Sequence, residues 1–299
     1  MSGTFATVEK VQAPDSHQWI AVKKYNAKHG QLVTRHCERE VHILSLLGIR
    51  SQEESCRHHI IYLINIEQKG SVTCLTFPYY SHTLQHYVNQ HMDHAFTLRA
   101  IQQIAQGLNF LHHRDIIHCD VSPSNILIHE DGHMVLSDFG CAHRLNEPVQ
   151  SSVFEEVGTR YYKAPEHLFG YRVYTPATDI WSLGAIYGQL LLGKPIFDGE
   201  TDLEQIGKII KVLGRPSDAI LEREIFDYPD ARKFIFFLPK SSKHDDKDKQ
   251  LQRVLDNHHI DPKDQKLILG MLTWSKQDRI SGEEVSCESR TPSTRITGI

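Results

Sequence analysis

Two aspartates lie in the stretch LHHRDIIHCDVSPSN, residues 111–125, and their spacing separates them chemically. An aspartate that orients a hydroxyl for phosphoryl transfer is followed five residues later by an asparagine that binds a metal ion. Asp120 and Asn125 have this separation, whereas Asp115, in the visible His-Arg-Asp tripeptide, lies ten residues before Asn125. We therefore predict that Asp120 is the base and that Asp115 occupies a loop between a long helix and a short strand.

A lysine and a glutamate upstream are of the types that hold a triphosphate. Lys23 ends the strand-like segment Ala-Val-Lys, where its ammonium could contact the α- and β-phosphates. Glu40 lies on the helix predicted next and could pair with Lys23 to fix its position. Taken alone, a strand lysine and a helix glutamate are usually solvated, so this interpretation depends on the other motifs.

A further acidic group follows a predicted strand. Asp138 stands in Ser-Asp-Phe-Gly, residues 137–140, directly before the flexible Phe-Gly pair. A carboxylate there could bind Mg²⁺ that bridges phosphate oxygens, together with the side chain of Asn125. The tripeptide Asp-Phe-Gly is common, and an ordinary turn is the simpler interpretation when it is taken alone.

The segment GTRYYKAPE, residues 158–166, follows at a distance suited to a loop that receives a substrate. Arg279, far downstream, is placed to pair with Glu166 at the end of this segment. If that pair is buried, removing one partner costs about 3–5 kcal/mol. A surface position would be the default for Arg279 considered without Glu166.

These residues require a small β-rich part followed by a larger helical part. HQWIAVKKY, residues 17–25, and VTCLTF, residues 72–77, are enriched in β-branched and aromatic residues and predict strands. Between them, apolar residues at helical spacing within residues 35–47 predict a helix. After Tyr80, the apolar spacing over residues 98–111 predicts a long amphipathic helix that leads to the two aspartates.

Further along the chain, three patterns predict a hairpin, a buried helix and a loop. The apolar segments on either side of Asp131 and Gly132 predict a hairpin, and a zinc site between the histidines of this turn is disfavoured. Residues 179–192 are apolar on most faces, which predicts a buried helix that ends at Gly193. The charged residues 241–250 predict an exposed loop.

The composition excludes several classes of function. The chain has 33 basic and 37 acidic side chains and a formal net charge of −4, which gives no electrostatic footprint for nucleic acid or an anionic membrane. No segment is long and apolar enough to span a bilayer, and the amino terminus lacks the apolar run of a signal peptide. Six cysteines without a Cys-x-x-Cys pair predict reduced thiols, with Cys119 and Cys141 as small buried hydrophobes. We expect a soluble protein of the cytoplasm or nucleus, without nucleic-acid or membrane partners.

The order and separations of six residues resemble those of the protein kinase superfamily. These residues are Lys23, Glu40, Asp120, Asn125, Asp138 and Glu166. The resemblance extends from Gly3 to about Val285. Within it, GTRYYKAPE and YTPATDIWSLGAIYGQLLLGKPIFDGETDLEQIGKIIKVLGRP are similar to cyclin-dependent-kinase-like enzymes of the CMGC type. GTRYYKAPE and Pro123 resemble serine/threonine kinases rather than tyrosine kinases.

The resemblance implies an α+β, bilobal protein kinase fold that binds ATP and Mg²⁺. It implies a small antiparallel β-rich N-lobe with one key helix and the hinge (1–80), a larger, mainly helical C-lobe (81–285) and an atypical tail (286–299). Asp179 would hold the catalytic loop by its backbone, and Phe77 would be the gatekeeper beside the hinge. The residues expected around the nucleotide and its metal are Gly3, Val8, Ala21, Lys23, Phe77, Tyr80, Asn125 and Asp138.

One departure from the family concerns activation by phosphorylation. The arginine before the catalytic aspartate normally pairs with a phosphorylated residue of the activation segment. Here that arginine is Cys119, and the position of the activating threonine is Phe154. Of the three arginines that gather this phosphate in the family, Arg39 remains, and the third aligns with His143. The threonine that would accept the phosphate and two of the three arginines that would bind it are absent together. This predicts that the activation segment is held by the packing of Phe154 instead of by a phosphate.

Ser151 and Ser152 leave phosphorylation open as the alternative, while Thr159 lines the expected substrate site. The segment TRHCERE, residues 34–40, lacks the cyclin-contacting helix motif, so a cyclin partner is not expected. An enzyme that needs neither cyclin nor an activating phosphate resembles the single-subunit yeast kinases that phosphorylate cyclin-dependent kinases. A protein substrate is therefore expected, with a cyclin-dependent kinase as the candidate.

Three other departures weaken the case for catalysis. Ser122 stands two residues after Asp120, where serine/threonine kinases usually place a lysine near the transferring phosphate. The glycine-rich loop is GTFATV, with Gly3 as its middle glycine and Ala6 in place of the last. Residues 286–299 have little apolar content for the expected terminal helix. We expect either a naturally trimmed protein or an incomplete or misjoined reading of its gene.

The resemblance also implies a first strand and a first loop glycine, which would lie upstream of Met1. Without this strand, the sheet has an unpaired edge above the nucleotide. We expect weaker ATP binding and a lower melting temperature than in a version extended by about a dozen amino-terminal residues. Thermal denaturation and nucleotide titration of both versions check this, and equal melting temperatures would contradict it.

Two classes of function therefore compete. The leading hypothesis is an ATP-dependent protein serine/threonine kinase, a transferase with a cell-cycle role, independent of cyclin and of activation-loop phosphorylation. The alternative is a catalytically impaired pseudokinase that acts as a nucleotide-binding or scaffolding module, which Ser122 and Cys119 favour and the intact catalytic residues oppose. A metabolic small-molecule kinase is disfavoured, because the Ala-Pro-Glu segment and the helix over residues 179–192 build a protein-substrate site.

Overall fold

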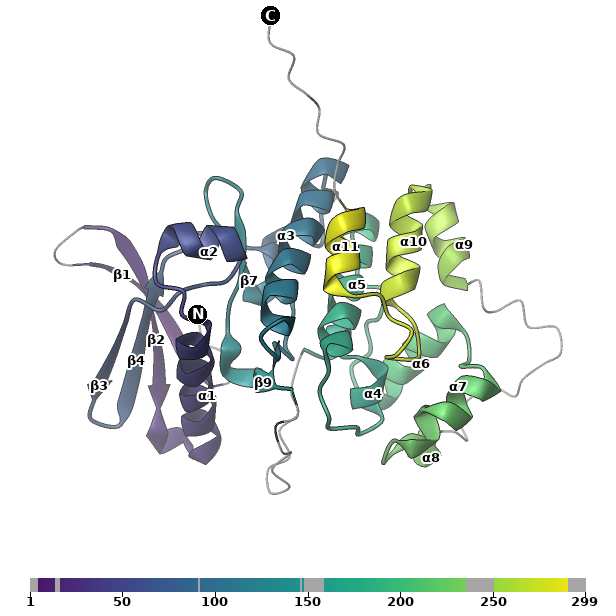
Figure 1. Cartoon of the computed structure of the whole chain (residues 1–299), viewed down its shortest axis with the longest axis horizontal. Helices are drawn as coiled ribbons and strands as arrows, with labels where there is room; N and C mark the ends of the chain where they lie inside the picture. The colour runs from purple at the N-terminus through teal and green to yellow at the C-terminus, as the bar shows by residue number, and fades with distance from the viewer. Residues whose placement is uncertain are drawn as a thin grey trace, which may run out of the picture.

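The computed structural model describes residues 5–13, 17–90, 92–145, 147, 159–234 and 250–289. A β-rich amino-terminal part and a larger helical part lie side by side (Figure 1). Some residues for which the sequence made predictions lie outside the described residues, namely Gly3, Ser151, Ser152, Phe154 and residues 241–249. The described residues nevertheless include the catalytic loop and the segments that position it.

A four-stranded antiparallel sheet forms most of the amino-terminal part. Its strands are β1 (Thr7–Gln12), β2 (Trp19–Asn26), β3 (Asn65–Lys69) and β4 (Val72–Pro78). They are ordered β1-β2-β4-β3, which confirms the two predicted strands as neighbours. The register places Val8 opposite Lys23 and Ala21 opposite Phe77, so residues expected around a nucleotide share one region of the sheet. Among the described residues, β1 is an edge strand, and all its residues are exposed.

Helix α1 (Gln31–Leu47) lies beside this sheet and confirms the helix predicted over residues 35–47 (Figure 1). Its apolar face is buried through Val33, Cys37, Ile43, Leu44 and Leu47. Glu40 lies three and four residues from members of this face, so the helical repeat points its side chain inward. The helix ends at Gly48, whose left-handed backbone (φ 66°) lets its N–H bond the Leu44 carbonyl.

Short strands connect the two parts. β5 (His82–Thr83) follows the link at Tyr79 and Tyr80 and pairs with β7 (Ile126–Ile128), which pairs with β8 (Met134–Leu136). The β7–β8 hairpin turns at Gly132, which has a φ of 87°, as its turn residues predicted. β6 (Ile116–Ile117) pairs with β9 (His143–Arg144) and so brings the two sides of the catalytic region together.

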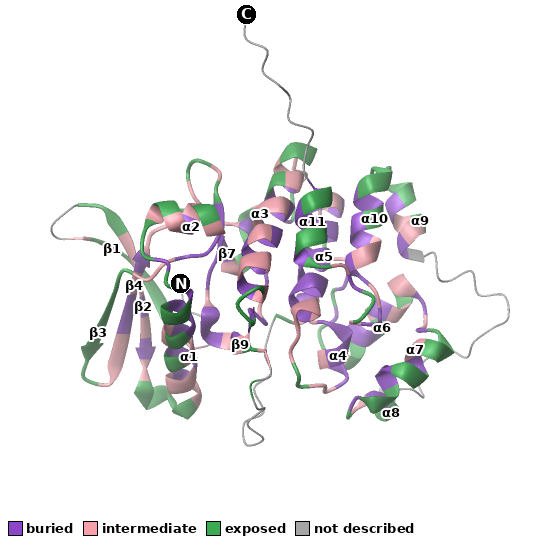
Figure 2. Cartoon of the chain, viewed as in Figure 1, coloured by how far each residue is buried: buried purple, intermediate pink, exposed green. Residues whose placement is uncertain are grey.

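The helical part is built around α5, which is buried over most of its length (Figure 2). Its helices are α3 (His94–His112), α4 (Pro165–Leu168), α5 (Pro176–Leu192), α6 (Asp202–Leu213), α7 (Asp218–Arg223), α8 (Ala231–Phe234), α9 (Gln250–Asn257), α10 (Pro262–Met271) and α11 (Gly282–Glu288). Trp181 and Tyr187 of α5 are fully buried. Burying each such side chain contributes roughly 1.5–3 kcal/mol, so α5 is a rigid base for the loops at its amino-terminal end.

Among the elements that were not expected from the sequence, two flank predicted segments. Helix α2 (Gln52–His58) begins at Ser51, whose hydroxyl accepts the Glu54 N–H at 3.2 Å. Helix α11 continues beyond the expected lobe boundary at Val285, and Ser286 and Ser289 are buried there. The described part of the chain contains no helix that is both long and apolar enough to cross a membrane.

Candidate active site

The catalytic loop lies between β6 and β7 and brings Asp120 and Asn125 into direct contact. The Asn125 side-chain amide donates to the Asp120 backbone oxygen and to Asp120 Oδ2, at 2.9 Å each. On the other side, the Thr159 N–H and hydroxyl donate to Asp120 Oδ1 at 2.9 and 3.1 Å. The spacing of Asp120 and Asn125 thus corresponds to a contact, and GTRYYKAPE reaches the same carboxylate.

Asp115 occupies the loop between α3 and β6, as the spacing predicted. Its backbone is left-handed, with a φ of 55°, and its carbonyl accepts the Leu145 N–H at 2.7 Å. This contact anchors the end of β9. The His-Arg-Asp tripeptide is therefore placed at the end of a helix, one strand away from the Asp120–Asn125 pair.

Asp179, near the start of α5, holds the catalytic loop through the backbone. The N–H groups of His118 and Cys119 donate to its two carboxylate oxygens at 2.9 Å each. Cys119 has a φ of 65°, an unfavourable conformation for a residue with a side chain, and these bonds to a buried carboxylate stabilise it. His112 Nε2 also lies 2.8 Å from Asp179 Oδ2, a contact that sequence reasoning missed.

Lys23, Glu40 and Asp138 form one ionic cluster, in which Lys23 and Glu40 are buried and Asp138 is partly exposed. Lys23 Nζ lies 3.0 Å from both Glu40 carboxylate oxygens and 2.9 Å from Asp138 Oδ1. The Tyr25 hydroxyl donates to Glu40 at 2.8 Å, and the Phe139 N–H donates to it at 3.3 Å. Sequence reasoning missed Tyr25, although its position two residues after Lys23 puts both side chains on one face of the strand.

The pKa values in this region follow from burial and charge. Burial alone would lower the pKa of Lys23, but the Glu40 and Asp138 carboxylates outweigh it and raise the pKa, so the ammonium stays charged. Burial raises the pKa of Glu40, with the Lys23 ammonium opposing it. Burial also raises the pKa of Asp120, and the nearby Asp138 carboxylate adds to this effect. A raised pKa improves Asp120 as a proton acceptor at neutral pH.

Asn125 and Asp138 offer a donor set that fits Mg²⁺. The Asn125 amide nitrogen is bound to Asp120, so its side-chain oxygen is the atom suited to a cation. Asp138 keeps 44% of its side-chain surface exposed while Lys23 binds one of its oxygens. Mg²⁺ is usually bound by one or two such oxygen donors together with phosphate oxygens and waters. These two residues would therefore hold the metal beside the triphosphate.

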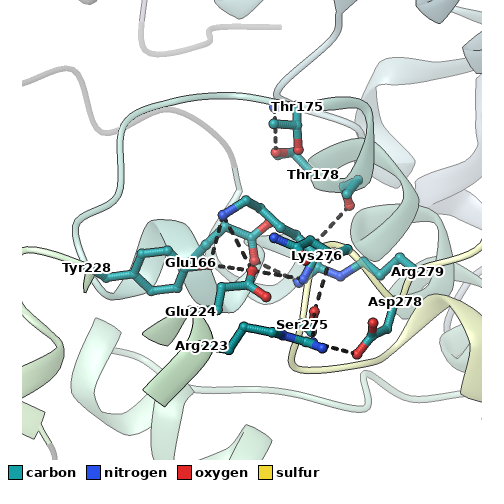
Figure 3. A network of polar contacts seen from close by, with 12 residues as sticks. Glu166, Thr175, Thr178, Arg223, Glu224, Tyr228, Ser275, Lys276, Asp278 and Arg279 are labelled. Atoms are coloured by element: carbon teal, nitrogen blue, oxygen red, sulfur yellow. Dashed lines mark hydrogen bonds and ion pairs between the residues drawn. The ribbon is translucent and has the colours of Figure 1, made fainter. Parts of the chain in front are cut away.

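The segment that ends in Ala-Pro-Glu is fixed by a buried ion pair. Glu166 and Arg279 meet in a two-pronged contact, with both N···O distances at 2.7 Å (Figure 3). Their side chains are 1% and 0% exposed, and Arg279 Nη1 also donates to the Ala177 carbonyl at 2.9 Å. Burial would raise the pKa of Glu166, but the Arg279 charge and hydrogen bonds lower it overall. The pairing proposed from sequence is therefore present and buried.

A protein kinase domain model matches residues 2–289 of the chain. The chain belongs to the protein kinase family. The bilobal kinase fold is thereby confirmed, with its antiparallel N-lobe sheet and mostly helical C-lobe. The domain match continues past Val285 to Ser289, and helix α11 continues past it to Glu288.

Curated relatives of this kinase include cyclin-dependent, cyclin-dependent-kinase-like and mitogen-activated protein kinases. It is 29% identical over 239 residues to cyclin-dependent kinase 20 of Danio rerio, covering 78% of this chain and 67% of that protein. It is 33% identical over 222 residues to cell division control protein 2 homolog 3 of Trypanosoma brucei brucei, covering 73% and 68%. It is 31% identical over 255 residues to mitogen-activated protein kinase pmk-1 of Caenorhabditis elegans, covering 82% and 63%. The resemblance to cyclin-dependent-kinase-like enzymes is thus confirmed.

The positions that gather the activating phosphate in related kinases form a different cluster here. Cys119 is buried and packs among apolar neighbours, with its Sγ 3.8 Å from His143 Nδ1. The His143 ring lies 4.7 Å from the Tyr174 ring. Arg39, the remaining arginine, donates to a backbone carbonyl at 3.0 Å and lies 3.6 Å from the Glu147 carboxylate. This arrangement already balances the charge of Arg39.

Ser122 occupies the position where a lysine would approach the transferring phosphate. It is buried, and its hydroxyl lies 2.9 Å from the Ser124 hydroxyl. This side chain therefore brings no positive charge. Lys23 is instead paired with Asp138, and Lys163 lines a small pocket together with Asp120 and Thr159.

Burial makes Cys119 a poor nucleophile. Burial raises the pKa of the Cys119 thiol well above its ordinary range, and the Asp179 carboxylate adds to this. Because the thiolate is the reactive form, we expect iodoacetamide to label exposed Cys287 well before Cys119 in the folded kinase. Peptide mass spectrometry over a labelling time course measures both rates. If Cys119 and Cys287 were labelled equally fast in the folded protein, Cys119 would be accessible and ionised, which would contradict this prediction.

Proposed function

We propose that this kinase transfers the γ-phosphoryl group of ATP to serine or threonine hydroxyls of protein substrates. The observation that carries the proposal is the contact set of Asp120, whose Oδ2 is held by Asn125 while Oδ1 accepts the Thr159 hydroxyl. That second contact supports the ability of Oδ1 to accept an aliphatic hydroxyl. A substrate hydroxyl in the same place would be oriented by Asp120 and would lose its proton to it.

The remaining residues would supply positioning and charge. Lys23, fixed by Glu40, would contact the α- and β-phosphates, as its charge and position between two carboxylates support. Asn125 and Asp138 would hold Mg²⁺, which neutralises charge on the phosphates when it is bound. Little covalent chemistry is required of the protein, so this positioning provides most of the expected rate enhancement.

We further propose that activity requires neither cyclin nor phosphorylation of the activation segment. Independence from phosphorylation is supported by the Cys119–His143–Tyr174 packing and by the pairing of Arg39 with Glu147. Independence from cyclin is supported by the sequence TRHCERE, residues 34–40, which lacks the cyclin-contacting motif. A phosphate on the activation segment would have Arg39 as its remaining arginine partner, and Arg39 is already paired with Glu147. Because this kinase resembles the single-subunit kinases of yeasts that phosphorylate cyclin-dependent kinases, we propose a cyclin-dependent kinase as its protein substrate.

The test uses bacterially expressed, unphosphorylated kinase with Mg·ATP, no cyclin, and a substrate panel that includes a cyclin-dependent kinase. We expect transfer to serine or threonine, with Ser151→Ala and Ser152→Ala retaining it within about twofold, because neither phosphate would have a full arginine cradle. Thr159→Ala is compared separately, since Thr159 contacts Asp120. Loss of transfer in either serine variant would reject phosphate independence.

Ser122 favours a second candidate, a pseudokinase that binds nucleotide without turnover. The absence of positive charge at this position would slow transfer while leaving Lys23, Asn125 and Asp138 able to bind Mg·ATP. Thermal shift distinguishes the two. Stabilisation by Mg·ATP without transfer to any panel member would favour the binding module and would reject catalysis.

A further inference from the structure

His36 lies between Phe5, which precedes β1, and the Asp-Phe-Gly segment. It is a buried residue of α1, four positions before Glu40, so both side chains project from the same helix face. The Phe5 ring stacks on the His36 ring with centroids 3.8 Å apart and an interplanar angle of 16°. On its other side, His36 Nδ1 lies 4.0 Å from Cys141 Sγ.

The fit on the second side is close. A Cβ atom added at Gly140 would lie 3.0 Å from His36 Nδ1, tighter than most real contacts. Glu40, on the same face, accepts the N–H of Phe139 and binds Lys23. One face of α1 therefore touches the loop before β1, the strand lysine and the Asp138 segment, the three parts that would surround a triphosphate.

We propose that His36 is a positioning residue, which fixes Phe5 and Ala6, the described part of the glycine-rich loop before β1, beside the phosphates of ATP through its stack on Phe5. The inference rests on the proposed binding of ATP. In GTFATV, Ala6 stands in place of the last glycine of the family pattern. Among the described residues, β1 is an edge strand. The stack gives this loop an anchor on the core, and a loop that is already placed loses less freedom when the nucleotide binds.

The variant His36→Ala removes the stack. Offset and stacked aromatic pairs account for roughly 2- to 12-fold in an equilibrium constant, so we expect KM for ATP to rise by about that factor. The catalytic constant and KM for the protein substrate should change by less than about twofold, because Asp120 and Asn125 are held by each other and by Thr159. Affinity for adenosine should be unchanged, since adenosine lacks the phosphates that the loop covers.

Matched variants separate this role from a general loss of structure. His42→Ala removes an exposed histidine of the same helix and should leave KM for ATP unchanged. His36→Phe keeps an aromatic ring against Phe5 and should recover most of the lost ATP affinity. Phe5→Ala should act like His36→Ala, and the double variant should be no worse than either single one, because both remove the same contact. Phe5→Ala also serves as the test if His36→Ala does not fold.

Calorimetric titration with a non-hydrolysable ATP analogue distinguishes this inference from the proposed function. If no protein is phosphorylated but His36→Ala weakens analogue binding relative to adenosine, the positioning role stands and the proposed catalysis fails. If transfer is normal and His36→Ala leaves KM for ATP unchanged, the catalysis stands and the positioning role is wrong. A lower KM in His36→Ala would also overturn it, because the stack would then hold the loop away from the nucleotide.

Discussion

Replacing Asp120 with asparagine should reduce phosphoryl transfer by roughly 10²–10⁴-fold, whereas Asp115→Asn should change it by less than about twofold. Asparagine keeps the shape of Asp120 but cannot accept the proton of the substrate hydroxyl. Asp115 lies in the loop after α3, where its contribution is a backbone contact to Leu145 that asparagine retains. Steady-state kinetics with a peptide or protein acceptor measures both variants.

The two substitutions are a matched pair, since each changes one carboxylate to an amide within six residues of sequence. Asp120→Asn should still be stabilised by Mg·ATP in a thermal-shift measurement, because Lys23 and Asp138 are untouched. If Asp115→Asn removed activity and Asp120→Asn retained it, the assignment of the base from the spacing to Asn125 would be reversed.

Breaking the Glu166–Arg279 pair should have the largest effect on stability. Glu166→Ala leaves a buried, unpaired guanidinium, and we expect a loss of about 3–5 kcal/mol in the free energy of unfolding. The melting temperature should fall on the order of 10 °C. Chemical denaturation and thermal unfolding measure the two quantities.

Two comparisons sharpen this test. Replacing both partners with apolar residues, as in Glu166→Leu with Arg279→Met, should cost less than the single change, because no buried charge is left unpaired. Glu53→Ala breaks an ion pair with Arg57 in which the side chains are 80% and 63% exposed, and it should change stability by less than about 1 kcal/mol. Equal losses in Glu166→Ala and Glu53→Ala would contradict a dominant role for burial.

The pH dependence of this pair follows from the lowered pKa of Glu166 in the fold. A carboxylate with a folded-state pKa below its ordinary value of 4.5 contributes stability that is fully present above pH 4.5. That contribution is lost as the pH falls through the folded-state pKa. The stability difference between the kinase and Glu166→Gln should therefore be constant near neutral pH and shrink below pH 4.5.

Local patterns determined the parts of the molecule that depend on near neighbours in sequence. The five-residue separation of Asp120 and Asn125 corresponds to two hydrogen bonds, because a short turn leaves few ways to join them. Enrichment in β-branched and aromatic residues identified β2 and β4, helical spacing identified α1 and α3, and apolar residues on most faces identified α5. By contrast, the polar strand β3 (NIEQK) has little apolar alternation, and its pairing with β4 supplies the signal that its own sequence lacks.

The order of the motifs along the chain and the resemblance to the kinase family also predicted some long-range pairs. Lys23–Glu40 and Glu166–Arg279 were expected and are present. Other contacts were decided by the tertiary structure alone. The stack of Phe5 on His36 and the contact of His112 with Asp179 join segments 31 and 67 residues apart. A histidine on an apolar face looks the same in sequence whether it fills space or supports a loop. The folded chain distinguishes these roles, because contact energy depends on which surfaces meet, and distant segments meet only after the sheet and helices have packed.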